Sequence, residues 1–194
     1  QISFFNFFTF GISPTLDDLE RYSGSLGLNL PVVAEPSDVR GALLQPSGFG
    51  VIEWPANHRL IADVAPVGPD YQPGHAHADT LSCELSLFGQ RVLVNSGISQ
   101  YGQGAERHQE RSTEAHNTVT LDGLNSSDVW GGFRVGRRAK PFDVGVDTEP
   151  GEVRIRASHD GYAHLATKPI HTRRWTATHS ELVIEDVFSG SYKR

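Results

Sequence analysis

Two histidines and an aspartate at two-residue spacing form the segment of the sequence with the clearest chemical potential. His75, His77 and Asp79 alternate with Ala76 and Ala78. Side chains two residues apart share one face of a β-strand, so an extended segment would present the three titratable groups together. The same face continues into apolar residues, which are Leu81, Cys83, Leu85 and Leu87. This pattern predicts a strand that runs from the core to the floor of a cleft.

An imidazole changes its protonation state near neutral pH and is also a common metal ligand. His75 and His77 could therefore transfer protons or bind a metal ion. The alternative is that both are hydrogen-bonded at the end of a strand and have no further role. Cys83 lies within the apolar alternation, where a buried hydrophobic role is expected. As the single cysteine, it excludes a disulfide within the chain.

Further candidate residues lie downstream of this segment. Arg107 and Arg111 are four positions apart, so a helical turn would place both guanidinium groups on one side, and such a fork matches a carboxylate or sulfate. Salt bridges to neighbouring glutamates are the alternative. Tyr101 could transfer a proton through its hydroxyl group, or lie half-buried at a strand end. Trp130 could stack on a sugar ring, or be buried in the core.

Short apolar runs of period two, separated by turn residues, dominate the chain from Gly48 onward. This pattern is typical of an antiparallel all-β domain, and a sandwich is favoured because no helix-length amphipathic segments intervene. Hairpin turns are predicted at Gly89-Gln90 and near His179-Ser180. The predicted strands are Gly50–Trp54, Arg59–Val64, Thr80–Phe88, Arg91–Asn95, Asn117–Leu121, Val153–Ser158, His171–Thr178 and Leu182–Phe188.

One short N-terminal helix is predicted between Ser13 and Gly27. Ser13 is a suitable cap, Pro14 suits the first turn and acidic residues follow early in the segment. We expect a connector with this helix over residues 1–46 and an all-β sandwich domain over residues 47–194. The N-terminus offers no signal-peptide pattern, and the C-terminal residues predict a turn into another strand. Both ends are therefore expected to be cut from a longer chain.

Composition excludes some classes of partner. The chain has 194 residues and a formal net charge of −6, with 17 basic and 23 acidic side chains intermingled. No basic stripe for nucleic acid is expected. An acidic polysaccharide is not excluded, because the local field of a cleft decides its binding. No apolar stretch approaches the roughly 20 residues of a membrane span.

Several motifs together resemble the heparinase II/III-like family of polysaccharide lyases. They are Gly-His-x-His-x-Asp-x-Leu-Ser at positions 74–82, a hairpin followed by Tyr101, Arg-x-x-x-Arg at 107–111, Ala-His-Asn-Thr-Val at 115–119, Asp-Gly-Tyr at 160–162, His-Thr-Arg-Arg at 171–174 and Leu-Val-Ile-Glu-Asp at 182–186. Each motif is weak alone, but the combination is specific, and the resemblance spans about residues 47–190.

The resemblance implies a two-part enzyme, with an α/α toroid followed by a β-sandwich domain. Such an enzyme cleaves uronate-containing polysaccharides by β-elimination, and much of the machinery comes from the toroid. The toroid would be the missing partner domain here, so this chain alone is expected to be inactive. A bacterial origin and a periplasmic or secreted location are expected on the same ground.

The resemblance implies a role for His75, and three other residues are candidates for the same reaction. His75 matches the histidine that faces the substrate, so it is expected to transfer a proton or to neutralise the uronate carboxylate. Tyr101 is the second catalytic candidate because its hydroxyl group could lie in the cleft. Arg107 and Arg111 are the candidates for substrate binding.

A structural zinc is also implied, with His77, Asn95 and His116 at the ligand positions. The family has an aspartate where this chain has Asn95, so two neutral imidazoles and an amide would leave the dication uncompensated. We therefore expect weakened, substoichiometric zinc, or a hydrogen-bonded cluster without metal. Asn95 would pair near Glu84, roughly 23 Å along a straight strand from His77, so a bend or bulge would be needed.

Two other functions stay open. A cupin-like metal enzyme would also begin with Gly and His-x-His, but it needs a glutamate three or four positions beyond the second histidine. Glu84 lies seven positions after His77 and on the opposite face, which weakens this alternative. A non-catalytic carbohydrate-binding sandwich would need aromatic platforms rather than a histidine cluster.

Overall fold

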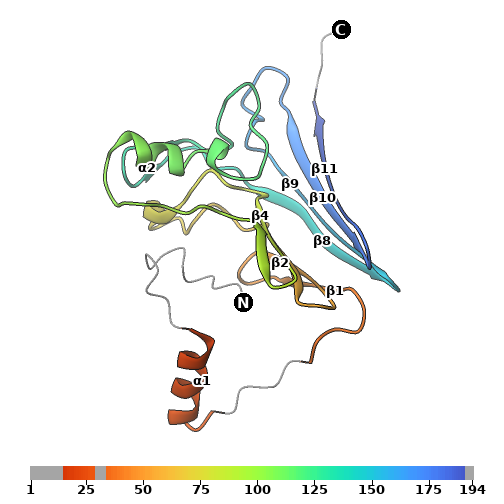
Figure 1. Ribbon diagram of the computed structural model, residues 1–194. Helices are drawn as coiled ribbons and strands as arrows, with labels where there is room; N and C mark the ends of the chain where they lie inside the picture. The colour runs from red at the N-terminus through yellow and green to blue at the C-terminus, as the bar shows by residue number, and fades with distance from the viewer. Residues whose placement is uncertain (1–14, 29–33, 191–194) are drawn as a thin grey trace.

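Two antiparallel sheets form the body of the protein (Figure 1). The computed structural model describes residues 15–28 and 34–190. The five-stranded sheet has the order β1-β2-β3-β4-β5, the four-stranded sheet has the order β11-β10-β9-β8, and β6 and β7 form a small ribbon. The strands are β1 Arg40–Leu44, β2 Phe49–Trp54, β3 His58–Asp63, β4 Cys83–Leu87, β5 Gln90–Leu93, β6 Val129–Trp130, β7 Arg134–Val135, β8 Pro141–Glu149, β9 Glu152–His159, β10 Ile170–Thr178 and β11 Leu182–Ser189.

The core lies between the two sheets. Ile52 and Leu60 from the first sheet and Ile155 and Trp175 from the second are fully buried in one cluster. A side chain at Gly41 in β1 would clash with Val153 in β9, so glycine allows close approach of the sheets at this point. The predicted all-β antiparallel sandwich is confirmed.

Most predicted strands are confirmed with small shifts in their ends. The predicted segments near β2, β3, β4, β5, β9, β10 and β11 all contain strands, and both predicted hairpins are present. The first hairpin turns at Phe88 and Gly89, which both have positive φ, as a tight hairpin requires. The strand predicted at Asn117–Leu121 was wrong, because this segment forms only an isolated bridge between Leu121 and Leu124.

The sequence pattern missed two strands that complete the sheets. β1 lies in the segment expected to be connector, yet it pairs with β2 over its whole length. β8 pairs with β9 and contains a register shift between Phe142 and Gly145. That irregularity breaks the alternation of side chains along the strand, which explains why period-two analysis overlooked it.

The extended strand predicted through His75 and His77 was also wrong. Pro73–His75 is a short 3-10 helix, η2, and residues 76–82 are irregular before β4 begins. Hydrogen bonds to a distant loop explain the difference. The Ala78 N–H donates to the Arg111 carbonyl, and the Ala78 carbonyl accepts from the Thr113 hydroxyl. The backbone is therefore satisfied without a neighbouring strand.

Three further helical elements complete the described chain. They are α1 Leu16–Ser25, α2 Ala105–Glu110 and the 3-10 turn η3 Thr113–Ala115. Thr15 caps α1 in a capping box with Asp18, whereas the predicted cap Ser13 lies outside the described residues. None of the helices within residues 15–28 and 34–190 has the length and hydropathy to cross a membrane.

Candidate active site and histidine cluster

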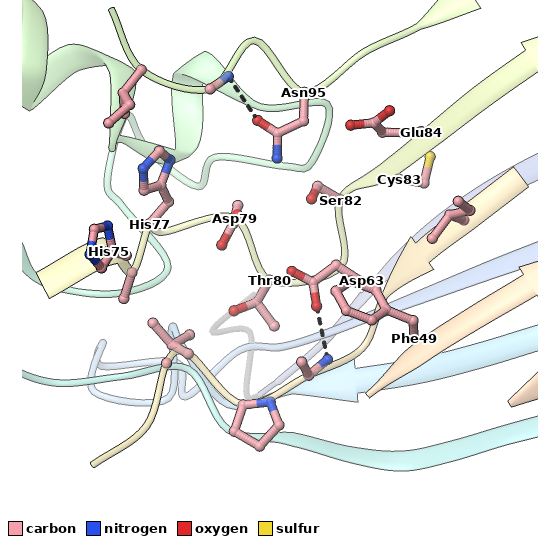
Figure 2. A pocket seen from close by; sticks show the side chains of 18 of the residues that line it. Phe49, Asp63, His75, His77, Asp79, Thr80, Ser82, Cys83, Glu84 and Asn95 are labelled. Atoms are coloured by element: carbon pink, nitrogen blue, oxygen red, sulfur yellow. Dashed lines mark hydrogen bonds between the residues drawn. The ribbon is translucent and has the colours of Figure 1, made fainter. Parts of the chain in front are cut away.

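A cavity of about 630 Å³ opens where three chain segments meet (Figure 2). One segment follows β3, one precedes β4 and one follows β5. Loops at one end of the strands of the first sheet therefore supply most of the cavity walls. His75, His77, Asp79, Asp63 and Asn95 all line the cavity. Residues that lie far apart in an extended chain are therefore collected around one space.

His77 lines the cavity and forms a buried pair with His116. His77 Nδ1 lies 3.2 Å from His116 Nε2, and His116 Nδ1 lies 3.1 Å from Asn95 Oδ1. Burial and the neighbouring His116 lower the pKa of His77 to about 3. Burial also lowers the pKa of His116, although the Asp79 carboxylate opposes this shift. Both rings are therefore neutral at pH 7, which is the state required of a metal ligand.

The hydrogen bonds of this cluster define its tautomers. Asn95 Oδ1 also accepts from the Gly97 N–H, which identifies this atom as the amide oxygen, and an oxygen can only accept. His116 Nδ1 must then carry the proton, leaving the Nε2 lone pair directed toward His77. The distance of 3.2 Å between His116 Nε2 and His77 Nδ1 is close to the roughly 3.3 Å between two nitrogen ligands of a tetrahedral zinc ion.

Asp79 is the residue that sequence analysis placed beside the histidines but did not count as a ligand. Ligand atoms of His77, Asp79 and His116 all lie within 4.8 Å of one another. The spacing of two residues between His77 and Asp79 was the available signal. The donor set is thus two neutral imidazoles and one carboxylate, which fits a zinc ion.

Asp63 is a second carboxyl group that sequence analysis missed. It lies at the end of β3, lines the same cavity and accepts a hydrogen bond from the Ala65 N–H. Burial, followed by the charge of Asp79, raises the pKa of Asp63 well above its usual range. The floor of the cavity therefore has a carboxyl group that favours its neutral form.

The structure brings Arg107 and Arg111 together, but as buried residues. Their exposed fractions are 0% and 1%. Arg107 donates to the carbonyls of Gly132 and Gly74, while Arg111 donates to those of Ala76, Gly131 and Arg134. The guanidinium groups thus hold the His75 segment against the β6–β7 ribbon. A direct contact of either arginine with substrate stays a prediction.

His75 lies at the exposed rim of this arrangement. Its ring centroid is 5.7 Å from that of Tyr101, in edge-to-face orientation. The Tyr101 side chain is 44% exposed, and it stacks beside Phe133, which sequence analysis did not select. The two catalytic candidates are therefore neighbours at the surface, where a polymer could reach them, and His75 also lines the cavity.

A family model described as heparinase II/III-like, C-terminal, matches residues 38–194. The chain belongs to the heparinase II/III-like family. Its match covers the complete sandwich, including the strand β1 that the sequence pattern had assigned to the connector. The comparison with curated proteins gave no match.

Solved structures share the fold of this heparinase II/III-like domain. A heparan sulfate lyase HepC mutant from Pedobacter heparinus has a TM-score of 0.62 and 20% identity, over 89% of this chain and 25% of that chain. The heparinase III BT4657 gene product with methylated lysines has a TM-score of 0.65 and 22% identity, over 91% and 27%. The chain therefore spans about a quarter of these relatives, and identities below 25% support the fold alone.

A second polar cluster in the heparinase II/III-like domain connects the second sheet with the loops that carry the site. Arg173 in β10 donates to both carboxylate oxygens of Asp186 in β11 and to the carbonyls of Leu81 and Asn117. The Asn117 side chain in turn bonds the backbone of Cys83. Arg173 thus connects the second sheet with the loops on both sides of the histidine cluster.

Proposed function

We propose that this domain supplies one wall of the active site of a polysaccharide lyase that cleaves uronate-containing chains by β-elimination. The observation that carries the proposal is the exposed ring of His75, which lines a cavity and lies beside Tyr101, within a domain of the heparinase II/III-like family. Two groups able to transfer protons lie next to each other there, while His77, the other histidine that lines the cavity, is buried.

β-Elimination defines what these groups must do. A base removes the C5 proton, the electron pair forms the C4–C5 double bond, and the bond from C4 to the leaving O4 breaks. An acid then protonates O4, and a positive or hydrogen-bonding group stabilises the uronate carboxylate during the reaction. An imidazole suits proton transfer near pH 7, so we assign His75 to a proton-transfer or carboxylate-neutralising role, with Tyr101 as its hydroxyl-bearing neighbour.

The test uses the full-length protein, because the similar solved chains are about three and a half times as long as this one. The protein is incubated with heparan-type, alginate and other uronate polymers, and the ultraviolet absorbance of the unsaturated uronate product is followed. We expect absorbance to rise with one class of polymer. Absence of product from every uronate polymer, with binding retained, would instead favour a non-catalytic carbohydrate-binding sandwich.

We further propose that His77, Asp79 and His116 hold a zinc ion. The Asn95 side chain would orient His116 by accepting a hydrogen bond from the His116 Nδ1–H. Asp79 supplies the negative charge that Asn95 lacks, and an outer hydrogen-bond acceptor on a ligating histidine is a common feature of zinc sites. When bound, the ion would connect the segment before β4 with the loop after η3. Its contribution would be structural, since both histidine ligands are buried and Asp79 is half-buried.

Zinc content tests this assignment directly. After loading and dialysis, elemental analysis of the full-length protein is expected to give about one zinc per chain. Asp79→Asn should lose most of it, because the ligand charge is removed, and Asn95→Ala should weaken affinity about 10- to 100-fold. Asp147→Asn, at an exposed position of β8, is the control. Equal zinc in Asp79→Asn and wild type would contradict the ligand set.

A further inference from the structure

Two aromatic rings form an exposed platform next to His75. The rings of Tyr101 and Phe133 lie 6.3 Å apart between centroids and are inclined by only 19°. Their exposed fractions are 44% and 47%, although an aromatic side chain gains stability from burial. We call these two side chains the aromatic platform. The centroid of the Tyr101 ring lies 5.7 Å from the centroid of the His75 ring. A group that packs on the platform therefore lies beside the proposed proton-transfer residue.

Close backbone approach builds this platform. Tyr101 precedes α2, while Phe133 belongs to the turn between β6 and β7, about thirty residues later in the chain. A side chain at Gly132 would clash with the carbonyl oxygen of Gly102, so only glycine allows the two segments to meet. Arg107 then fixes the contact by donating to the Gly132 carbonyl. The platform is therefore held by the fold rather than formed by two loose side chains.

The Arg107 side chain places a positive charge close to both rings of the platform. The Arg107 guanidinium carbon is 5.6 Å from the Tyr101 centroid and 5.7 Å from the Phe133 centroid. Within residues 15–28 and 34–190, neither Arg107 nor Arg111 forms an ion pair with a carboxylate. Burial lowers the pKa of Arg107, although Tyr101 and Glu110 oppose this shift. Burial and the neighbouring Arg107 lower the pKa of Arg111 to about 10. A field from poorly screened buried cations favours an anion at this surface.

We propose that the aromatic platform is a stacking subsite for an acidic pyranose ring, with Phe133 as a specificity-determining residue. This proposal rests on the proposed lyase function, because the sugar ring is taken to belong to the polymer that reaches His75. The apolar C–H face of a pyranose packs on the flat rings, and its carboxylate is attracted by the buried arginines. An apolar protein segment would gain nothing from those two charges, which favours the acidic sugar as occupant.

The binding experiment separates stacking from charge. The full-length protein with His75→Ala, which prevents turnover, is titrated by calorimetry with unsulfated tetrasaccharides of glucuronate–hexosamine and of mannuronate. The same tetrasaccharides with reduced carboxyl groups keep the ring shape but lose the charge. We expect one acidic tetrasaccharide to bind, and its carboxyl-reduced form to bind roughly tenfold more weakly.

Variants of Phe133 test the platform itself. Phe133→Ala should weaken binding roughly tenfold, whereas Phe133→Tyr should restore it because the flat ring is kept. Phe142→Ala is the matched control, since Phe142 is an exposed phenylalanine on β8. Tyr101→Phe should also retain binding, because the platform needs the ring and not the hydroxyl group.

The outcomes distinguish this proposal from the lyase proposal. Binding that depends on Phe133, without product from any polymer in the wild type, would retain the subsite and reject the lyase. Product formation with equal affinity in Phe133→Ala and Phe142→Ala would reject the subsite alone. Unchanged affinity together with a lowered unfolding temperature in Phe133→Ala would show that protein covers the rings, and would also overturn the subsite.

Discussion

Replacing His75 with alanine in the full-length protein is expected to lower the rate of uronate product formation by about 10²- to 10⁴-fold, the usual contribution of a proton-transferring residue. His75 is exposed at the end of η2, and its ring lies beside that of Tyr101. Because the His75 side chain is exposed, the unfolding temperature should stay within a degree or two of wild type. Initial rates from ultraviolet absorbance and thermal unfolding followed by circular dichroism provide the two measurements.

His164→Ala is the matched control for this prediction. His164 is exposed and forms a hydrogen bond with the nearby Gly161 carbonyl, so its loss should leave the rate unchanged. A His75→Ala protein that turns over at the wild-type rate would remove His75 from the chemistry. The proton transfers would then have to come from Tyr101 or from groups outside this domain.

The sandwich could be predicted because most of its strands obey a simple rule. β9, β10 and β11 alternate between buried and exposed faces with clear turn residues between them, and period-two analysis finds such strands. β8 escaped because its register shifts at Gly145. β1 escaped because its inward-facing positions include Gly41 while the exposed Leu44 is apolar, so its alternation in burial is not visible as an alternation in hydropathy. The failures thus fall where the local signal is interrupted or absent.

The site could be predicted in its residues but not in its geometry. His77 and His116 were paired through the resemblance, and they do meet, at 3.2 Å. The straight strand that would have kept Asn95 far from them does not form, because Leu81 adopts a positive φ and the chain turns before β4. Hydrogen bonds from residues more than thirty positions away hold that turn. No local pattern encodes such contacts.

The two arginines illustrate a different limit of sequence analysis. Their spacing predicts that Arg107 and Arg111 share one side of a helix, but spacing cannot say whether that side faces solvent or protein. In the structure it faces five backbone carbonyls. Only the three-dimensional arrangement shows that the Arg107 guanidinium group also lies over the rings of Tyr101 and Phe133.

Replacing Arg173 with methionine is expected to lower the free energy of unfolding by about 3–5 kcal/mol, the cost of removing one partner of a buried ion pair. Arg173 is 5% exposed and bonds both oxygens of Asp186 as well as the Leu81 and Asn117 carbonyls. Burial alone would raise the pKa of Asp186, but hydrogen bonds from His171 and Arg173 hold it well below its usual range. Without Arg173, a partly buried carboxylate and two carbonyls would lose their main donor. Urea unfolding at pH 7 measures the effect.

Arg174 provides the control at the adjacent position. Its ion pair with Glu185 is exposed on both sides, so Arg174→Met should cost no more than about 1 kcal/mol. A double variant, Arg173→Met with Asp186→Leu, should be more stable than Arg173→Met alone because no unpaired charge is left. Equal losses in Arg173→Met and Arg174→Met would contradict the buried network. Since Arg173 bonds the loops on both sides of the histidine cluster, its loss should also shift the NMR signals of the His77 and His116 rings, which a purely local defect in the second sheet would not do.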